Sequence, residues 1–218
     1  MPQAKVQYED LIFINCPFDT SYYPMFRAII FAVYRCGFIP TSALATDNSL
    51  QNRLAKIQNC ILSAKYGIHD ISRTGLNAKR LPRFNMPFEL GLFFGAKEFG
   101  SRKQKAKNAI IFDINKYRYQ EFISDLNGID IKAHFNNPYA AIKHIRDWLR
   151  VSSKRKNLPG ETLLIQEYKK FKKTVPYTAK KLGFKPNDIP YNDYCGMTEV
   201  RIRILLSADR KVNSMSNF

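Results

Sequence analysis

The chain has 218 residues, enough for one sizeable hydrophobic core and a small appendage. Its 45% hydrophobic content, including 13% aromatic residues, excludes a disordered protein. The net charge of +17 favours anionic partners such as nucleic acid, nucleotides or acidic protein surfaces. No apolar stretch approaches the ~20 residues of a membrane helix, and no secretory-signal pattern opens the sequence. We therefore expect a cytoplasmic protein without membrane contact.

Strand and helix patterns alternate along the first 151 residues. Five short apolar runs predict strands at residues 11–15, 38–44, 66–70, 109–113 and 129–134. Apolar side chains at helical spacing predict helices at 21–36, at 47–63, after Pro87, at 119–126 and at 139–151. Pro40 predicts that the second strand is short or near an edge of the sheet.

This alternation is the signature of a doubly wound, Rossmann-like or flavodoxin-like α/β domain with a parallel sheet of about five strands. The domain is expected to span residues 1–151. Residues 152–160 are polar and basic and end in Pro159-Gly160, which predicts a linker. Residues 151–218 have 14 Lys and Arg against 6 Asp and Glu, and for residues 161–218 we expect a small, basic, mostly helical appendage.

Within this C-terminal region, residues 161–174 predict a helix with lysines on one side. Its other side is apolar, formed by Leu164, Ile165, Tyr168 and Phe171. Pro176 predicts a new helix over 177–182, and residues 199–207 predict a last helix or strand. The apolar face needs a partner, which predicts a homo-oligomer. The basic face leaves nucleic-acid binding open as an alternative.

The sequence has no pattern of metal ligands. Its four cysteines form no CxxC pair and its three histidines are scattered, which disfavours a zinc site. No GxGxxG or P-loop motif follows the first strand, which disfavours dinucleotide-dependent redox chemistry and ATP hydrolysis. We expect neither metal nor cofactor, and NAD or another nucleotide is considered only as a substrate.

Polar side chains gather at the predicted carboxyl ends of two strands. Ligands bind at this edge of doubly wound sheets. Asn15 and Asp19 follow the first strand, and Asp70, Ser72 and Arg73 follow the third. Two simpler interpretations stay open: Asp19 as a helix cap and Asp70 as a turn residue.

Glu89 is a carboxylate near the start of an otherwise apolar helix. Pro82 and Pro87 oppose a helix upstream and suit a helix start. A glutamate in a first turn is often a surface residue that the helix dipole stabilises. The apolar neighbours favour a catalytic or sugar-binding group instead. A polar loop lies just before it, with Arg80, Arg83 and Asn85.

Three motifs together resemble a prokaryotic branch of the nucleoside 2-deoxyribosyltransferase-like and TIR-like superfamily. They are Phe-Ile-Asn-Cys-Pro-Phe-Asp at 13–19, Gly-Ile-His-Asp-Ile-Ser-Arg at 67–73 and Asn-Met-Pro-Phe-Glu-Leu-Gly at 85–91. The resemblance covers roughly residues 10–150. The residues at 82–87 differ from the small residues common in the transferases, which concerns the substrate more than the fold.

This resemblance implies a role for each matching residue. Glu89, in its Glu-Leu-Gly pattern, corresponds to the catalytic carboxylate, and Asp70 to a group that binds the base or sugar. The loop after the first strand usually lines the pocket. The implied substrate-binding set is Asn15, Pro17, Phe18, Asp19, Asp70, Ser72, Arg73, Arg83, Asn85 and Met86.

The chemistry of these residues suits cleavage of an N-glycosidic bond. A carboxylate can attack C1′ of an oxocarbenium-like sugar or stabilise its charge. Arg73, Arg80 or Arg83 could hold a phosphate or diphosphate, as in NAD or a nucleoside monophosphate. We therefore predict a nucleotide N-glycosidase, such as an NAD hydrolase, or a deoxyribosyltransferase-like enzyme. A role in bacterial antiphage defence is compatible with this resemblance.

Two other functions stay open. One is a non-catalytic nucleotide sensor whose output is assembly or partner binding through the same pocket. The other is a nucleic-acid-binding protein that acts through the basic tail.

Overall fold

A computed structural model describes residues 6–75 and 83–215, with side chains up to residue 208. Arg80 and Pro82, which the sequence analysis singled out, lie outside the described residues. The described strands form one parallel sheet in the order β2-β1-β3-β4-β5. They are β1 (Leu11–Asn15), β2 (Ile39–Thr41), β3 (Tyr66–Asp70), β4 (Asn108–Asp113) and β5 (Lys132–Ala133).

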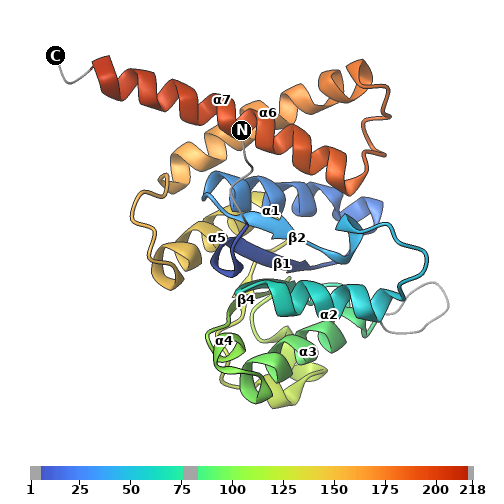
Figure 1. Cartoon of the computed structure of the whole chain (residues 1–218). Coiled ribbons are helices and arrows are strands. Elements are labelled where there is room, and N and C mark those ends of the chain that lie inside the picture. The colour runs from blue at the N-terminus through green and yellow to red at the C-terminus, as the bar shows by residue number, and fades with distance from the viewer. Residues whose placement is uncertain (1–5, 76–82, 216–218) are drawn as a thin grey trace.

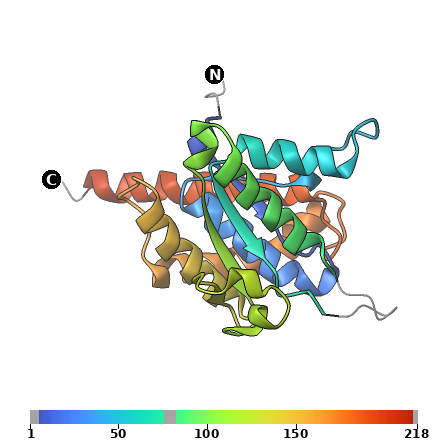
Figure 2. The same cartoon turned by 90° about the horizontal axis from the view of Figure 1, so that it is seen from below.

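Helices cover both faces of the sheet, which confirms the predicted doubly wound α/β fold. One face is covered by α1 (Tyr23–Arg35) and α5 (Pro138–Ser152), and the other by α2 (Arg53–Ser63) and α3 (Asn85–Phe99) (Figure 1). Figure 2 shows α2 and α3 side by side across the strands. The short α4 (Arg102–Lys105) follows α3. Single turns of 3-10 helix are η1 (Tyr8–Asp10), η2 (Thr20–Tyr22), η3 (Ala43–Ala45), η4 (Arg118–Glu121) and η5 (Ser124–Leu126).

Most predicted elements of the first 151 residues are present, with differences at their ends. The second strand is short and lies at the edge of the sheet, as Pro40 predicted. The second helix begins at Arg53 and not at residue 47, because the Asn52 side chain caps it by accepting from the Ala55 amide at 2.8 Å. The predicted helix at 119–126 is instead the two turns η4 and η5.

The C-terminal region differs more from its prediction. It forms two long helices, α6 (Glu161–Lys181) and α7 (Tyr191–Met215). The helix α6 does not break at Pro176. This proline is exposed, whereas Val175 and Ala179 beside it are buried against the core and keep the helix regular.

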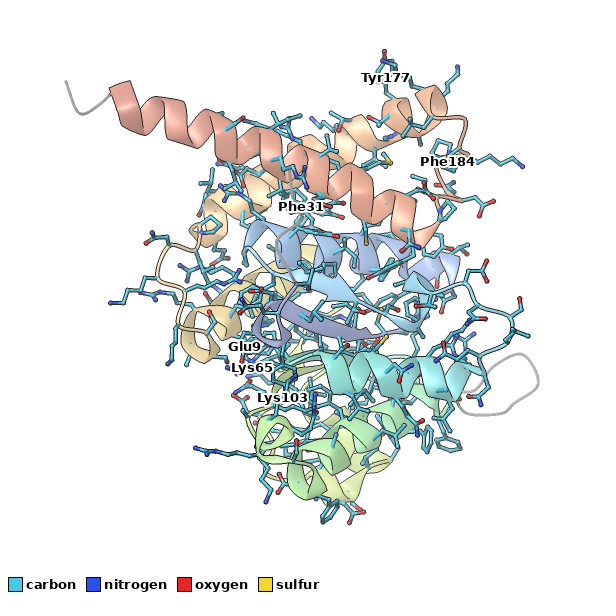
Figure 3. The ribbon with its side chains drawn as sticks, in the orientation of Figure 1. Glu9, Phe31, Lys65, Lys103, Tyr177 and Phe184 are labelled. Carbon is cyan, nitrogen blue, oxygen red and sulfur yellow. The ribbon has the colours of Figure 1, made fainter. Side chains whose placement is uncertain are left out.

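These two helices lie over α1 as an additional layer (Figure 1). Phe31 of α1 points toward this layer (Figure 3), where its ring centroid lies 5.5 Å from that of Phe171 and 5.3 Å from that of Tyr168. One continuous hydrophobic cluster includes residues of α1, α5, α6 and α7. The C-terminal helices therefore belong to the core of the α/β unit and are not an appendage.

The apolar face predicted to mediate self-association is covered within the chain. Leu164, Tyr168 and Phe171 are all buried against neighbouring helices. An oligomer stays a prediction, but this face cannot be its contact surface in the folded chain.

Two arginines form ion pairs that join the C-terminal region to the rest of the domain. Arg35 of α1 forms a two-bond ion pair with Glu167 of α6, through Nε at 2.7 Å and a terminal nitrogen at 3.1 Å. Both side chains are less than a tenth exposed. In the predicted linker, a terminal nitrogen of Arg155 donates to the Asp10 carboxylate at 2.6 Å. The guanidinium carbon of Arg155 lies 3.9 Å from the centroid of the Phe38 ring. The linker is therefore held against the domain.

Within the described residues, no helix is long and apolar enough to span a membrane.

If α6 and α1 share one core, truncating Phe171 to alanine should destabilise the whole protein. We expect Phe171→Ala to lower the free energy of unfolding by about 3–5 kcal/mol, the usual cost of removing a buried phenyl ring. Lys170→Ala, at the exposed neighbouring position, should change it by less than about 0.5 kcal/mol. Urea titration followed by circular dichroism measures both. Two separate unfolding transitions would contradict a shared core.

Candidate active site at the carboxyl edge of the sheet

Asn15 joins three elements at the carboxyl end of β1. Its side-chain nitrogen lies 3.0 Å from Nδ1 of His69 in β3 and donates to the Met86 carbonyl of α3 at 2.9 Å. Because the amide donates, Nδ1 of His69 accepts, which places the imidazole proton on Nε2. Burial, reinforced by the charge of Lys107, lowers the pKa of His69 to about 3, so the ring is neutral. Asn15 therefore fixes where α3 begins relative to the sheet.

Asp70 is fully buried and is held on several sides. One carboxylate oxygen accepts from the Tyr22 hydroxyl and lies 3.1 Å from Nε2 of His134, and the other accepts from the Ser72 amide at 2.8 Å. Nδ1 of His134 accepts from the Asn136 amide, so its proton is on Nε2, facing Asp70. Asp70 connects η2, β3 and the segment after β5. Its contact with a base or sugar stays a prediction.

Asp19 caps η2, as the simpler interpretation of the sequence proposed, and it also positions two arginines. It accepts from the Tyr22 amide at 3.1 Å and from the Ser21 hydroxyl at 2.5 Å. It pairs with Arg83 at 3.0 Å, while Arg73 donates to Ser21 at 3.0 Å. Burial opposes ionisation of Asp19, but the bonds from Ser21 and Arg83 lower its pKa.

A cavity of about 440 Å³ lies beside this cluster. The Ser72 hydroxyl and the Nε of Arg73 are buried and have no hydrogen-bond partner among the described residues. Two guanidinium groups and three hydroxyls at one cavity are suited to an anion such as phosphate, and we call it the anion cavity. The lining residues are Asp19, Thr20, Ser21, Ser72, Arg73, Gly75, Arg83 and Ile114.

Glu89 is the fifth residue of α3 and only 5% exposed, so it is not a first-turn surface residue. Among the described residues nothing forms a hydrogen bond or ion pair with its carboxylate. Burial raises its pKa from an ordinary 4.5 to about 7, although the positive charge of Arg53 opposes this shift. Glu89 is thus a buried carboxyl group whose raised pKa favours the protonated form more than in an ordinary glutamate.

Cys16, directly after β1, is influenced by the three predicted site carboxylates. Burial first, and then the charges of Asp70, Glu89 and Asp19, raise the pKa of its thiol well above the usual range. The charges of all three carboxylates act on this one buried thiol, which indicates that they lie on the same side of the sheet. The structure therefore brings together the residues that the sequence placed at this edge.

Other predicted residues serve the packing around this centre. Pro17 is buried, and Phe18 packs edge-on against Phe26 on the α1 side. The Met86 side chain is buried in a cluster that contains Leu90, and Asn85 is exposed where α3 starts.

The sequence analysis missed Tyr22 and His134 as partners of Asp70. A usable signal existed for His134, because it is the last residue of the fifth predicted strand and so falls at the same edge of the sheet. Tyr22 could not be separated from the apolar pattern of the helix that follows it.

A scan against protein-family models and searches of curated proteins and of solved structures found no match to this chain. The superfamily resemblance of the three motifs therefore stays a prediction. In the described part of the chain, no group of three or more His, Cys, Asp and Glu side chains could hold a metal ion.

The raised pKa of Glu89 predicts how stability depends on pH. Because the folded protein holds this proton up to about pH 7 and an unfolded glutamate releases it near 4.5, the stability that the neutral carboxyl contributes should fall between these values. We therefore expect wild type to lose stability relative to Glu89→Gln from pH 4.5 to 7, and no further change above 7. Urea unfolding at four pH values measures the difference.

Glu98→Gln provides the matched control, because Glu98 is exposed on the same helix. A difference between wild type and Glu89→Gln that stays constant across this pH range would show that Glu89 is not protonated in the folded protein.

Proposed function

We propose that this protein cleaves the N-glycosidic bond of a nucleotide, with Glu89 as the catalytic carboxylate. The observation that supports this most is the buried Glu89 carboxyl group, which no described residue hydrogen-bonds, at the edge where the anion cavity also lies. A group with a pKa near 7 is poised for chemistry at neutral pH. The motif resemblance supports the same assignment.

The proposed reaction has two steps. In the first, a Glu89 oxygen forms a bond to C1′ of the sugar, or stabilises its positive charge, while the bond from C1′ to the base nitrogen breaks. The electron pair of that bond leaves with the base: the nicotinamide of NAD leaves as a neutral molecule, whereas the base of a nucleoside monophosphate takes up a proton. In the second, water adds to C1′ and loses a proton, releasing the sugar phosphate and restoring Glu89. A second nucleoside base in place of water gives the transferase reaction.

The anion cavity supports a nucleotide over a nucleoside as the substrate. Arg73 and Arg83 line it, and the bonds to Ser21 and Asp19 hold their guanidinium groups in place. Asp19 competes with a phosphate for Arg83, but the guanidinium has further N–H groups to offer. NAD and nucleoside monophosphates are both compatible with this cavity. A role in antiphage defence remains part of the proposal through the resemblance alone.

Base release should require ionised Glu89. We expect wild type to release free base from NAD or from one of a panel of nucleoside monophosphates, with a rate that rises as pH increases through about 7. Glu89→Gln should abolish release while circular dichroism shows an intact fold, and Glu98→Gln should behave as wild type. Chromatography of the released base measures all three.

Two outcomes would change the assignment. Turnover retained in Glu89→Gln would exclude Glu89 as the catalytic carboxylate. Wild-type binding of a nucleotide without any release of base would instead favour the nucleotide-sensor alternative.

If Arg73 and Arg83 hold a phosphate, replacing either with alanine should weaken nucleotide binding about tenfold or more. A hydrogen bond to a charged group contributes about 1.5–3 kcal/mol, and the matching nucleoside should lose far less affinity. Calorimetric titration with both ligands measures the two losses. Arg102→Ala, at an exposed site on α4, is the control. Equal losses for nucleotide and nucleoside would indicate that the arginines only support the fold.

A further inference from the structure

A second cavity, of about 560 Å³, exists because the C-terminal helices pack on α1. It lies between the first turns of α1, the middle of α6 and the segment that joins α6 to α7. Its walls include Tyr23, Arg27, Tyr168, Lys172, Pro186 and Tyr194. It is distinct from the anion cavity, and among the described lining residues the two share Thr20 alone.

Two tyrosines form fixed aromatic walls of this second cavity. The hydroxyl of Tyr168 donates to the Pro24 carbonyl, and that of Tyr194 donates to the Arg27 carbonyl, both at 3.3 Å. Burial raises the pKa of both hydroxyls well above 10, so both rings are uncharged. Both side chains are only 2% exposed, so they form the rigid base of the cavity. The accessible ring in the lining is that of Tyr23, which is half-buried.

Two cations complete the second cavity. Arg27 donates to the Pro186 carbonyl at 2.8 Å, and its guanidinium carbon lies 5.3 Å from the Tyr194 ring centroid and 5.7 Å from that of Tyr23. Lys172 is exposed and forms no ion pair with any described residue. Neither Asp nor Glu is among the described residues that line the cavity.

We propose that this second cavity binds a small aromatic anion of the size of a nucleoside monophosphate. A volume of about 560 Å³ lies in the range of sites for small ligands. The tyrosine and proline walls suit a planar ring, since ring stacking does not depend on the identity of the base. Arg27 and Lys172 suit a phosphate, because no carboxylate of the lining opposes it. This site does not depend on the activity proposed for Glu89.

The full-length protein provides the test, with AMP, GMP, CMP and UMP as probes and the matching nucleosides for comparison. At least one monophosphate should bind about tenfold or more tightly than its nucleoside, the effect of one charge-assisted contact. Lys172→Glu should weaken that binding about tenfold or more. Lys173→Glu makes the same charge change at the next exposed position, outside the cavity lining, and should leave affinity within about twofold.

The variant Arg83→Ala distinguishes binding in the second cavity from binding in the anion cavity. Because Arg83 lines only the anion cavity, this variant should keep the binding that depends on Lys172. The proposal is overturned if none of the four monophosphates binds better than its nucleoside. It is also overturned if Lys172→Glu and Lys173→Glu weaken binding equally, or if Arg83→Ala removes the binding entirely. Absence of base release from any nucleotide would refute only the function proposed for Glu89.

Discussion

The architecture depends on the middle of helix α1, which has no face toward solvent. Residues 28–33 of α1 are six consecutive residues with no measurable exposure, all of them apolar. The sheet and α5 can cover only part of such a helix, and the hydrophobic effect requires cover for the rest. Helices α6 and α7 supply it, which explains why a lysine-rich C-terminal region packs so closely. The same packing creates the second cavity, so that cavity is a direct consequence of how α1 is buried.

Much of the fold could be predicted from local patterns. The prediction failed to place the C-terminal helices on α1, and the reason lies in the sequence of α1. Short apolar runs revealed the strands because a parallel sheet is buried on both faces. The helix at 21–36 was predicted from apolar side chains at helical spacing, and the significance of residues 28–33, which contain no polar side chain at all, was not recognised. That run required a second covering layer. The predicted helix break at Pro176 was also wrong. The packing of Val175 and Ala179 against the core outweighs the energetic cost of a proline within the helix.

The site was predictable where one residue is unusual for its surroundings, and unpredictable where contacts join distant segments. Glu89 could be identified because a carboxylate within an apolar helix is rare. The environment of Asp70 could not, since its partners Tyr22 and His134 come from segments 48 residues before it and 64 residues after it. A raised pKa likewise depends on burial in three dimensions, which the sequence pattern suggests only indirectly.

The buried carboxyl groups of Asp70 and Glu89 differ in their hydrogen-bond partners. We therefore propose different roles for them. The oxygens of Asp70 accept from Tyr22 and Ser72 and face His134, so the group holds three segments together. Glu89 has no such partner among the described residues, and its burial disfavours a negative charge. A positive charge that develops beside it would restore the lost stabilisation. In the reaction that we propose, an oxocarbenium-like transition state provides that charge while a neutral ground-state sugar does not, so the environment of Glu89 would favour that transition state selectively.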